Sequence, residues 1–189
     1  KDKISVKLFC DQMRFLSFII VIVLIGACQL DKENEESLRE NILIESDLEI
    51  IINSYFVCDK DSLEGGENQS DDFYKSGEHS VKTDSLRPYT LGHSIEDIHK
   101  GDIVRVSVWR NSKEKNGAIV ISDNSEGNNL YIESGITVYS EGEWDFIQCH
   151  YKATQNHSSI KIFVYNLSSK PVYFDDIKVE AYFNHSMPD

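Results

Sequence analysis

The stretch Pro171-Val-Tyr-Phe-Asp-Asp-Ile-Lys-Val-Glu-Ala-Tyr-Phe183 has the pattern of a long closing β-strand. Side chains alternate between the two faces of a strand, which predicts one face made of Tyr173, Asp175, Ile177, Val179 and Ala181. This set is apolar except for Asp175. A carboxylate in line with core-facing residues is costly unless it is hydrogen-bonded, paired or bound to a metal. Asp175 is therefore the first candidate for a special role.

The rest of residues 41–183 also has the pattern of short strands separated by Gly, Asn and Ser turns. Residues 102–109 alternate cleanly, with three valines on one side and Arg105, Ser107 and Trp109 on the other. Only residues 94–99 have a competing helical period. About 143 residues are enough for one domain. The pattern predicts an all-β fold, an antiparallel β-sandwich.

Residues 1–27 are expected to form a signal peptide, with Met13 as its true start. The apolar run 15–27 would rise about 20 Å as a helix, which is short of the roughly 30 Å hydrocarbon core of a membrane. It ends in Ile25-Gly26-Ala27-Cys28, which resembles the lipobox of bacterial lipoproteins. The resemblance implies that Cys28 is lipidated and becomes the new N-terminus. An ordinary cleaved signal or an uncleaved anchor is the alternative.

Residues 28–40 are acidic and almost free of bulky apolar side chains, which predicts a flexible tether. Residues 184–189 are expected to form a short tail. The chain has 19 Lys and Arg against 32 Asp and Glu; residues 1–27 hold four and two of these, which leaves a net charge of about −15. That charge disfavours nucleic acid and anionic lipid, so membrane attachment should come from the lipid alone. We expect the bacterial outer membrane as location, with the domain periplasmic or surface-exposed.

Five motifs follow one another along the domain: Asn41-Ile-Leu-Ile-Glu-Ser-Asp-Leu-Glu49, Ser76-Gly-Glu-His-Ser-Val-Lys82, the strand Ile103 to Arg110, Gly142-Glu-Trp144 and Tyr173-Phe-Asp-Asp-Ile177. In this order they resemble carbohydrate-binding modules of the galactose-binding-like jelly-roll superfamily. The resemblance spans nearly all of the domain and implies a jelly-roll sandwich of two sheets. It departs from the family at Leu48, where Phe is usual, and in the acidic loop 59–75, which has no clear counterpart.

The resemblance also implies a structural calcium ion where the first and last strands meet. The matching positions are Glu49 and Asp175, and carbonyl groups around Gly77 would complete a set of oxygen ligands, which calcium prefers. Asp176 is the second choice because it should point to the other face. The alternative is that backbone amides satisfy Asp175 at a strand bend.

Sugar rings stack on exposed aromatic side chains, while their hydroxyl groups need polar neighbours. Trp109 is the first candidate, since it shares the face opposite the valines with Arg105. Aromatic residues expected in loops or at strand ends could extend the platform: Tyr89, Tyr131 and Tyr139. Packing in the sandwich is the alternative for Trp109 and the favoured interpretation of Trp144.

No residues point to catalysis. Asp175 and Asp176, adjacent on opposite strand faces, cannot flank a glycosidic bond, and the six histidines lack metal-ligand spacing. Cys58 and Cys149 either form a disulfide or stay as two thiols. The sequence therefore predicts a non-catalytic envelope lipoprotein that binds carbohydrate, with a protein-interaction or adhesin module as the alternative and a protein partner as its ligand.

Overall fold

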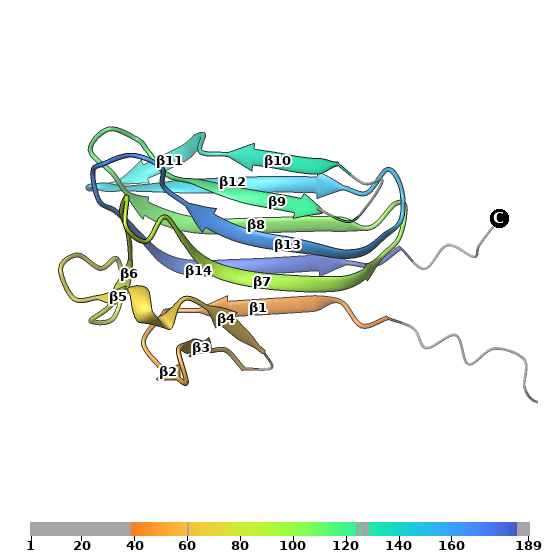
Figure 1. Cartoon of the computed structure of the whole chain (residues 1–189), viewed down its shortest axis with the longest axis horizontal. Coiled ribbons are helices and arrows are strands. Elements are labelled where there is room, and N and C mark those ends of the chain that lie inside the picture. The colour runs from red at the N-terminus through yellow and green to blue at the C-terminus, as the bar shows by residue number, and fades with distance from the viewer. Residues whose placement is uncertain (1–38, 60, 124, 126–128, 185–189) are drawn as a thin grey trace, which may run out of the picture. The chain divides into compact units, whose positions relative to one another are not determined.

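The computed structural model describes residues 39–59, 61–123, 125 and 129–184, and residues from Glu40 onward belong to one compact unit (Figure 1). The expected signal peptide, Cys28 and nearly all of the tether lie outside the described residues, as does the tail beyond Asn184. Within the described ranges, no helix is long and apolar enough to cross a membrane.

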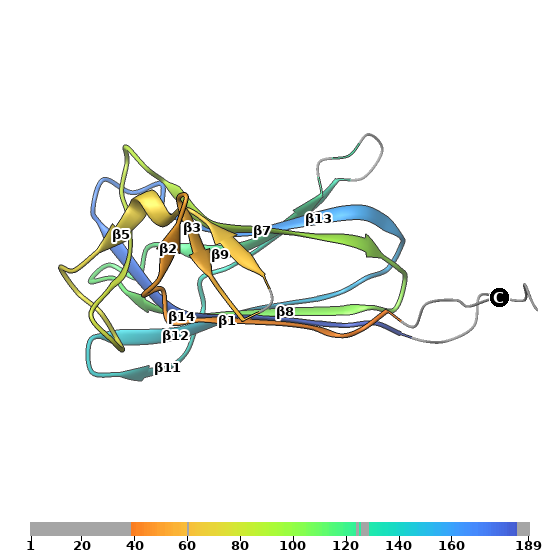
Figure 2. The same cartoon turned by 90° about the horizontal axis from the view of Figure 1, so that it is seen from below.

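The predicted all-β antiparallel sandwich is confirmed: two sheets face each other as separate layers (Figure 2). We call them sheet 1 and sheet 2. Sheet 1 has the order β11-β12-β8-β14-β6-β5, and β1 also pairs with β14. Its strands are β1 (Ile42–Ser46), β5 (Gln69–Ser70), β6 (Ser80–Thr83), β8 (Ile103–Asn111), β11 (Thr137–Glu141), β12 (Trp144–Lys152) and β14 (Val172–Tyr182).

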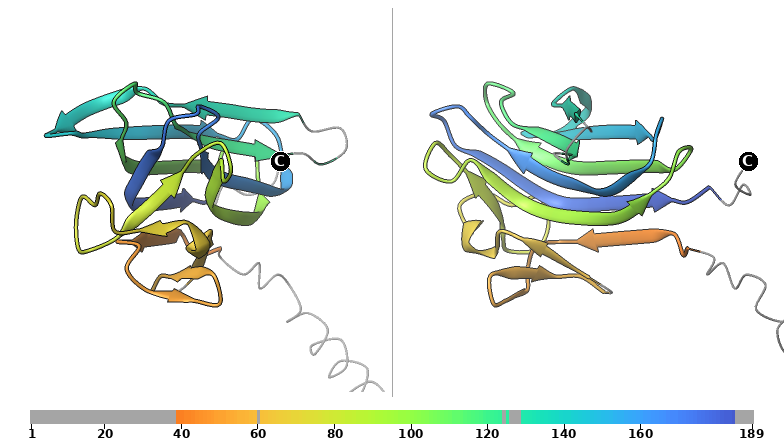
Figure 3. Two further views of the ribbon diagram at one scale, coloured as in Figure 1. Left: turned by 60° about the vertical axis from the view of Figure 1, so that its left-hand side comes forward. Right: turned by 45° about the vertical axis from the view of Figure 1, so that its right-hand side comes forward.

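Sheet 2 has the order β10-β9-β13-β7-β4-β3-β2, with the short hairpin of β2 and β3 at one side of the sandwich (Figure 3). Its strands are β2 (Ile51–Ile52), β3 (Tyr55–Val57), β4 (Ser62–Glu64), β7 (Tyr89–Ile98), β9 (Ala118–Asp123), β10 (Leu130–Ser134) and β13 (His157–Tyr165). The helical period at 94–99 does not correspond to a helix, because residues 94–98 form the last part of strand β7. The acidic loop 59–75 contains β4, β5 and the 3-10 helix η1 (Gly66–Asn68).

The core lies between the sheets and takes every second residue from the long strands. On β8 and β13 these residues are almost fully buried: Val104, Val106, Val108, Ile160, Ile162 and Val164. Burial of apolar surface, worth roughly 25 cal/mol per Å², is what holds the two layers together. Cys58 and Cys149 are both buried and both free thiols, so of the two alternatives the structure has the unbonded one.

A β-bulge interrupts the pairing of β14 with β8. The register shifts between Asp175 and Lys178. Asp176 and Ile177 therefore share the position opposite Val108, which is the two-against-one arrangement of a bulge. Asp176 has a φ of +48°, a left-handed backbone conformation that few residues other than glycine adopt.

The bulge reverses which face of β14 enters the core. Even-numbered residues are buried in the core before it and odd-numbered ones after it, as the core set shows: Val172, Phe174, Ile177, Val179 and Ala181. The prediction that Tyr173 and Asp175 share the core face with Ile177 is therefore wrong. Asp175 lies opposite Trp109, on the outer face of sheet 1, where the loop before β6 buries it.

Three buried polar side chains link the sheets at another point. The Tyr151 hydroxyl lies 2.6 Å from His157 Nε2, and His157 Nδ1 lies 2.6 Å from Asp123 Oδ2. Burial raises the pKa of Asp123, but hydrogen bonds from Ser125 and His157 outweigh this and lower it to about 2. The folded state therefore holds Asp123 ionised in a polar chain between β9, β12 and β13.

We predict that Asp123→Asn lowers the free energy of unfolding by about 1–3 kcal/mol at pH 7, because it breaks a buried hydrogen-bonded pair. A carboxylate with a lowered folded-state pKa stabilises above its unfolded pKa and loses this effect as pH falls through the folded value. The difference between wild type and variant should therefore shrink from pH 4 towards pH 2 in urea unfolding. Asp71→Asn, at an exposed aspartate, is the control; an equal loss there would remove the assignment.

Candidate functional site

Aromatic side chains gather on the outer face of sheet 2. In β13, Ile160, Ile162 and Val164 point into the core, so the residues between them point outward: Lys161, Phe163 and Tyr165. Tyr165 pairs with Tyr89 of β7, which places their side chains on the same face. We call Tyr89, Phe163, Tyr165, Tyr131 and the charged residues around them the aromatic face.

The rings of the aromatic face pack against one another and leave one ring open. Tyr89 and Tyr165 are nearly parallel, with an interplanar angle of 22° and centroids 6.2 Å apart. Phe163 meets Tyr89 edge-on at 5.7 Å. Tyr89 stays 58% exposed, while Phe163 and Tyr165 are half-buried. The two inner rings therefore support an outer ring that a ligand can reach.

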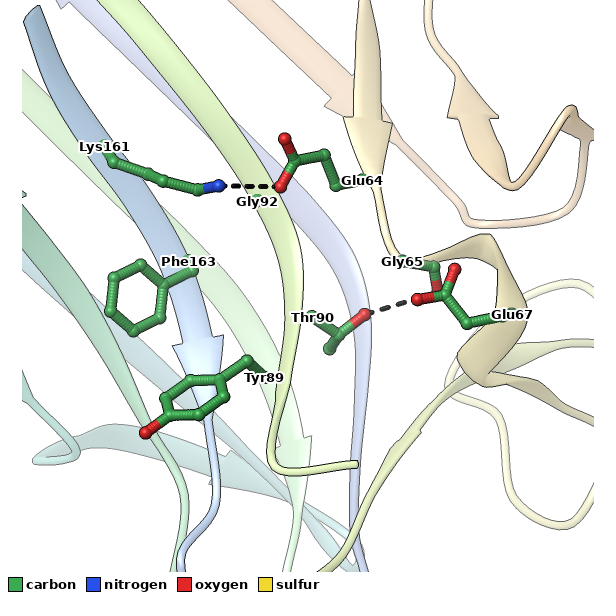
Figure 4. A pocket seen from close by; sticks show the side chains of 8 residues that line it. All are labelled: Glu64, Gly65, Glu67, Tyr89, Thr90, Gly92, Lys161 and Phe163. Atoms are coloured by element: carbon green, nitrogen blue, oxygen red, sulfur yellow. Dashed lines mark hydrogen bonds and ion pairs between the residues drawn. The ribbon is translucent and has the colours of Figure 1, made fainter. Parts of the chain in front are cut away.

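A groove of about 250 Å³ runs beside these rings and has charged walls (Figure 4). Lys161 Nζ lies 2.8 Å from Glu64 Oε2 across β7, and Glu67 also lines the groove. Gly92 makes this possible, because a Cβ there would stand 2.4 Å from the same Glu64 oxygen. Tyr89 and Phe163 line the groove next to this ion pair.

Tyr131 and Glu133 of β10 extend the aromatic face on its other side. The Tyr131 hydroxyl donates to Glu133 Oε2 at 3.4 Å. Burial, together with hydrogen bonding to Glu133 and Tyr131, raises the pKa of Tyr165 above its usual value. Tyr165 thus keeps its proton and can donate it in a hydrogen bond. The face combines stacked rings, tyrosine hydroxyl groups and carboxylate acceptors.

The structure divides the five sequence-predicted ligand residues between the two sheets. Tyr89 and Tyr131 belong to the aromatic face of sheet 2 and lie at the starts of β7 and β10, which fits the strand-end positions expected for them. Trp109, Tyr139 and Arg105 lie on the outer face of sheet 1. Sheet 1 and sheet 2 turn their outer faces away from each other, so one ligand cannot touch both groups.

Trp109 is covered where it lies. Tyr139 and Phe146 meet its ring edge-on at 5.2 and 5.3 Å. The Lys75 ammonium lies 4.5 Å from the centre of the same ring and also 2.9 Å from Glu141 Oε2. Arg105 faces Glu180 at 3.6 Å and does not join this cluster. Trp144 is buried, as expected for a packing residue.

Sequence reasoning missed Phe163, Tyr165 and Glu64. The signal for the first two was present in the alternation of Ile160-Lys-Ile-Phe-Val-Tyr165, where the apolar residues at odd positions have no place in the core. Glu64 gave no such signal, since its strand is three residues long and pairs with β7 only through the fold.

The predicted calcium ligands Glu49 and Asp175 hold the same loop, residues 75–79. Asp175 Oδ2 accepts from the backbone N–H groups of Lys75 at 2.6 Å and Ser76 at 3.2 Å. Glu49 Oε1 accepts from those of Glu78 at 2.8 Å and His79 at 2.9 Å. The sequence left open that backbone amides, and not a metal ion, satisfy Asp175, and the contacts to Lys75 and Ser76 are of that kind.

The fit to calcium is partial. Two carboxylates meet at one loop, and Gly77 in this loop has a φ of +58°, so another residue would strain the backbone and crowd Glu49 Oε1. The loop presents N–H groups to the carboxylates, whereas calcium takes oxygen ligands. Asp176 accepts from the Ser76 hydroxyl at 2.6 Å. Among the described residues, no three His, Cys, Asp or Glu side chains converge as a metal site. Calcium stays a prediction.

No family model and no curated protein matches the chain, whereas solved structures do. The CBM22-1–CBM22-2 tandem domain of Xyn10C from Paenibacillus barcinonensis matches with a TM-score of 0.50 and 13% identity, over 78% of this chain and 47% of that one. The CBM22-1 xylan-binding domain of Xyn10C matches with a TM-score of 0.43 and 15% identity, over 61% and 80%.

A family 16 carbohydrate-binding module matches with a TM-score of 0.39 and 15% identity, over 59% of this chain and 82% of that one. The chain spans about half the length of the tandem structure, the best-scoring of these three. At these identities the likeness concerns the fold alone. The domain thus has the jelly-roll sandwich seen in carbohydrate-binding modules, as the sequence motifs indicated.

We predict that Trp109→Ala lowers the melting temperature by about 5–10 °C, because about 2–3 kcal/mol of packing is lost from a half-buried ring. Tyr89→Ala, at a more exposed aromatic residue, should lower it by less than about 3 °C. Thermal unfolding followed by circular dichroism measures both. An unchanged melting temperature in Trp109→Ala would mean that this ring is a free platform after all.

Proposed function

We propose that the domain binds carbohydrate, without catalysis, on the aromatic face of sheet 2. The observation that carries the proposal is the open Tyr89 ring, held parallel to Tyr165 on a groove that Glu64 and Lys161 also line. The apolar C–H face of a sugar ring can stack on Tyr89. Hydroxyl groups at the ring edge can donate to Glu64 and Glu133 and to the hydroxyl oxygens of Tyr131 and Tyr165, whose own hydrogen bonds lie within the face.

The sandwich itself supports this proposal only in part, since many functions share one fold. A protein-interaction or adhesin module is the second candidate, and one observation favours it. The hairpin of β2 and β3 exposes apolar side chains next to one another: Ile50, Ile52, Tyr55 and Val57 are 41–62% exposed. Exposed apolar patches often mark binding surfaces for proteins.

We further propose the envelope setting that the sequence predicts. Lipid on Cys28 would attach the domain to the outer membrane through the tether. A surface-exposed or periplasmic glycan would then be the ligand within reach. Globomycin-sensitive processing and labelling with an alkyne fatty acid, lost in Cys28→Ala, would support this setting.

We also propose that calcium binds at Glu49 and Asp175. Support comes from the charge of Asp175, which is fully buried. Burial and the neighbouring Asp176 raise its pKa to about 7, although amide hydrogen bonds act in the opposite direction. An aspartate with a raised folded-state pKa destabilises the fold as pH rises from about 4 to 7, because the folded state prefers the proton. A bound cation would remove that penalty.

Calcium at about 100-fold its dissociation constant should raise the melting temperature at pH 8 by about 5–10 °C. The rise should be smaller at pH 5, where a proton competes for Asp175, and should be lost in Asp175→Asn. Thermal unfolding with calcium or with chelator measures this. Equal melting temperatures in both at pH 8 would show that the amide contacts satisfy these carboxylates without an ion.

The carbohydrate proposal predicts that the chain from Glu40 binds a defined glycan class on an array. Tyr89→Ala should weaken that binding at least tenfold, about 1.4 kcal/mol, because the stacking surface is lost. Tyr182→Ala, which removes an exposed tyrosine at the end of β14 in sheet 1, should leave glycan binding unchanged. The same array in chelator tests whether glycan binding depends on calcium.

Failure to bind any glycan, in calcium or without it, would overturn the carbohydrate proposal in favour of the interaction module. Binding that survives Tyr89→Ala but is lost in Trp109→Ala, with folding intact, would move the site to sheet 1.

A further inference from the structure

Acidic side chains predominate over basic ones on the aromatic face. Glu64 and Glu67 line the groove, Glu133 lies beside Tyr131 and Tyr165, and Glu96 follows along the same face, bonded to Ser159. Lys161 is the basic residue of the groove lining, and its ammonium is already 2.8 Å from Glu64. The local charge is therefore negative.

Neighbouring segments do not reverse this balance. Arg87 comes near the groove, but its Nη1 donates to the backbone carbonyl of Glu67 at 2.8 Å. The whole chain has a net charge of −13. A ligand that carries a negative charge would be repelled by these carboxylates. The cation of the groove lining, Lys161, is already paired with Glu64 and could not offset that repulsion.

Carboxylates can still serve a neutral ligand well. Each accepts hydrogen bonds from sugar hydroxyl groups, and bonds to an ionised acceptor are about twice as strong as neutral ones. A uronate brings its own carboxylate, which cannot donate to Glu64 or Glu133 and repels both. Like-charge juxtaposition of this kind is a common source of specificity in recognition.

We infer that the aromatic face selects uncharged glycans and rejects glycans that carry carboxylates. The inference rests on the proposed carbohydrate site and adds its ligand class. The selection comes from Glu64, Glu67 and Glu133 as acceptors and from the ion pair that occupies Lys161. The chain would then discriminate between polysaccharides of the same ring geometry by charge alone.

The test uses matched pairs of ligands that share their rings and linkages and differ at C6, where one form has a hydroxyl group and the other a carboxylate. Galactan and glucan oligosaccharides are compared with the same samples oxidised at C6, which turns a –CH2OH group into a carboxylate and leaves the ring unchanged. Isothermal titration calorimetry at low salt should show at least tenfold weaker binding of the oxidised form. The gap should narrow at 0.5 M NaCl, because salt screens exposed charges.

Charge-removing variants assign the effect to the face. Glu64→Gln removes one repelling charge and also frees Lys161, so it should narrow the ratio of neutral to oxidised affinity most. Glu133→Gln should narrow it less. Glu143→Gln makes the same change in net charge at an exposed turn of sheet 1 and should leave the ratio as in wild type.

The outcomes separate this inference from the proposed function. Equal or tighter binding of the oxidised forms would overturn the charge selection and leave the carbohydrate site in place. A ratio that narrows equally in Glu143→Gln would also overturn it, because overall charge would then be the cause. If the wild-type protein binds neither the neutral nor the oxidised glycans, the carbohydrate proposal itself is overturned.

Discussion

The β-bulge in β14 is the constraint on which both faces of sheet 1 depend. Asp176 and Ile177 together occupy one position of the pairing, so β14 has one residue more than β8 there. The strand can therefore bury even-numbered apolar residues before the bulge and odd-numbered ones after it. An unbroken strand in this register would turn one half of its apolar residues outward, since a shift of one residue exchanges the faces. The bulge also turns Asp175 away from the core and towards the loop of residues 75–79.

That loop explains why the two outer faces differ. Asp175 and Glu49 hold it by its backbone N–H groups, and Lys75, at one end of it, lies over the ring of Trp109. Sheet 1 thus has its tryptophan covered by a lysine and two aromatic rings. On sheet 2 the Tyr89 ring stays open beside the groove. The exposed ring beside this groove is therefore a tyrosine of sheet 2 and not the tryptophan, although Tyr139 on sheet 1 is also 52% exposed.

Charge shapes the open face as much as aromatic stacking does. In the proposed site, Tyr89 and the supporting ring of Tyr165 offer a stacking surface that suits any sugar, because every pyranose has an apolar C–H surface. Selectivity must come from the groups around them, and here these are carboxylates plus a lysine that Glu64 occupies. A narrow choice of ligand can thus arise on a fold that many binding modules share.

The sequence by itself determined the all-β sandwich, because strand periodicity and turn residues are local properties of the chain. It also identified Asp175 as exceptional and placed Tyr89 and Tyr131 among the candidates. It assigned Asp175 to the wrong face, since alternation counts residues and cannot register a bulge that β8 imposes from across the sheet. It did not predict a strand over β7. Leu91 in this strand has a φ of +53° and Gly92 has no side chain, so the regular alternation of side chains is interrupted there.

Only the tertiary structure decided which aromatic residues meet. Trp109 is separated from Tyr89 because their strands belong to different sheets, and Tyr89 joins Tyr165 because β7 pairs with β13. Pairing between strands some 75 residues apart depends on how the whole core packs, which no local pattern specifies. The ion pair of Lys161 with Glu64, 97 residues away, has the same origin. Fold class follows from local periodicity, whereas the site follows from long-range register.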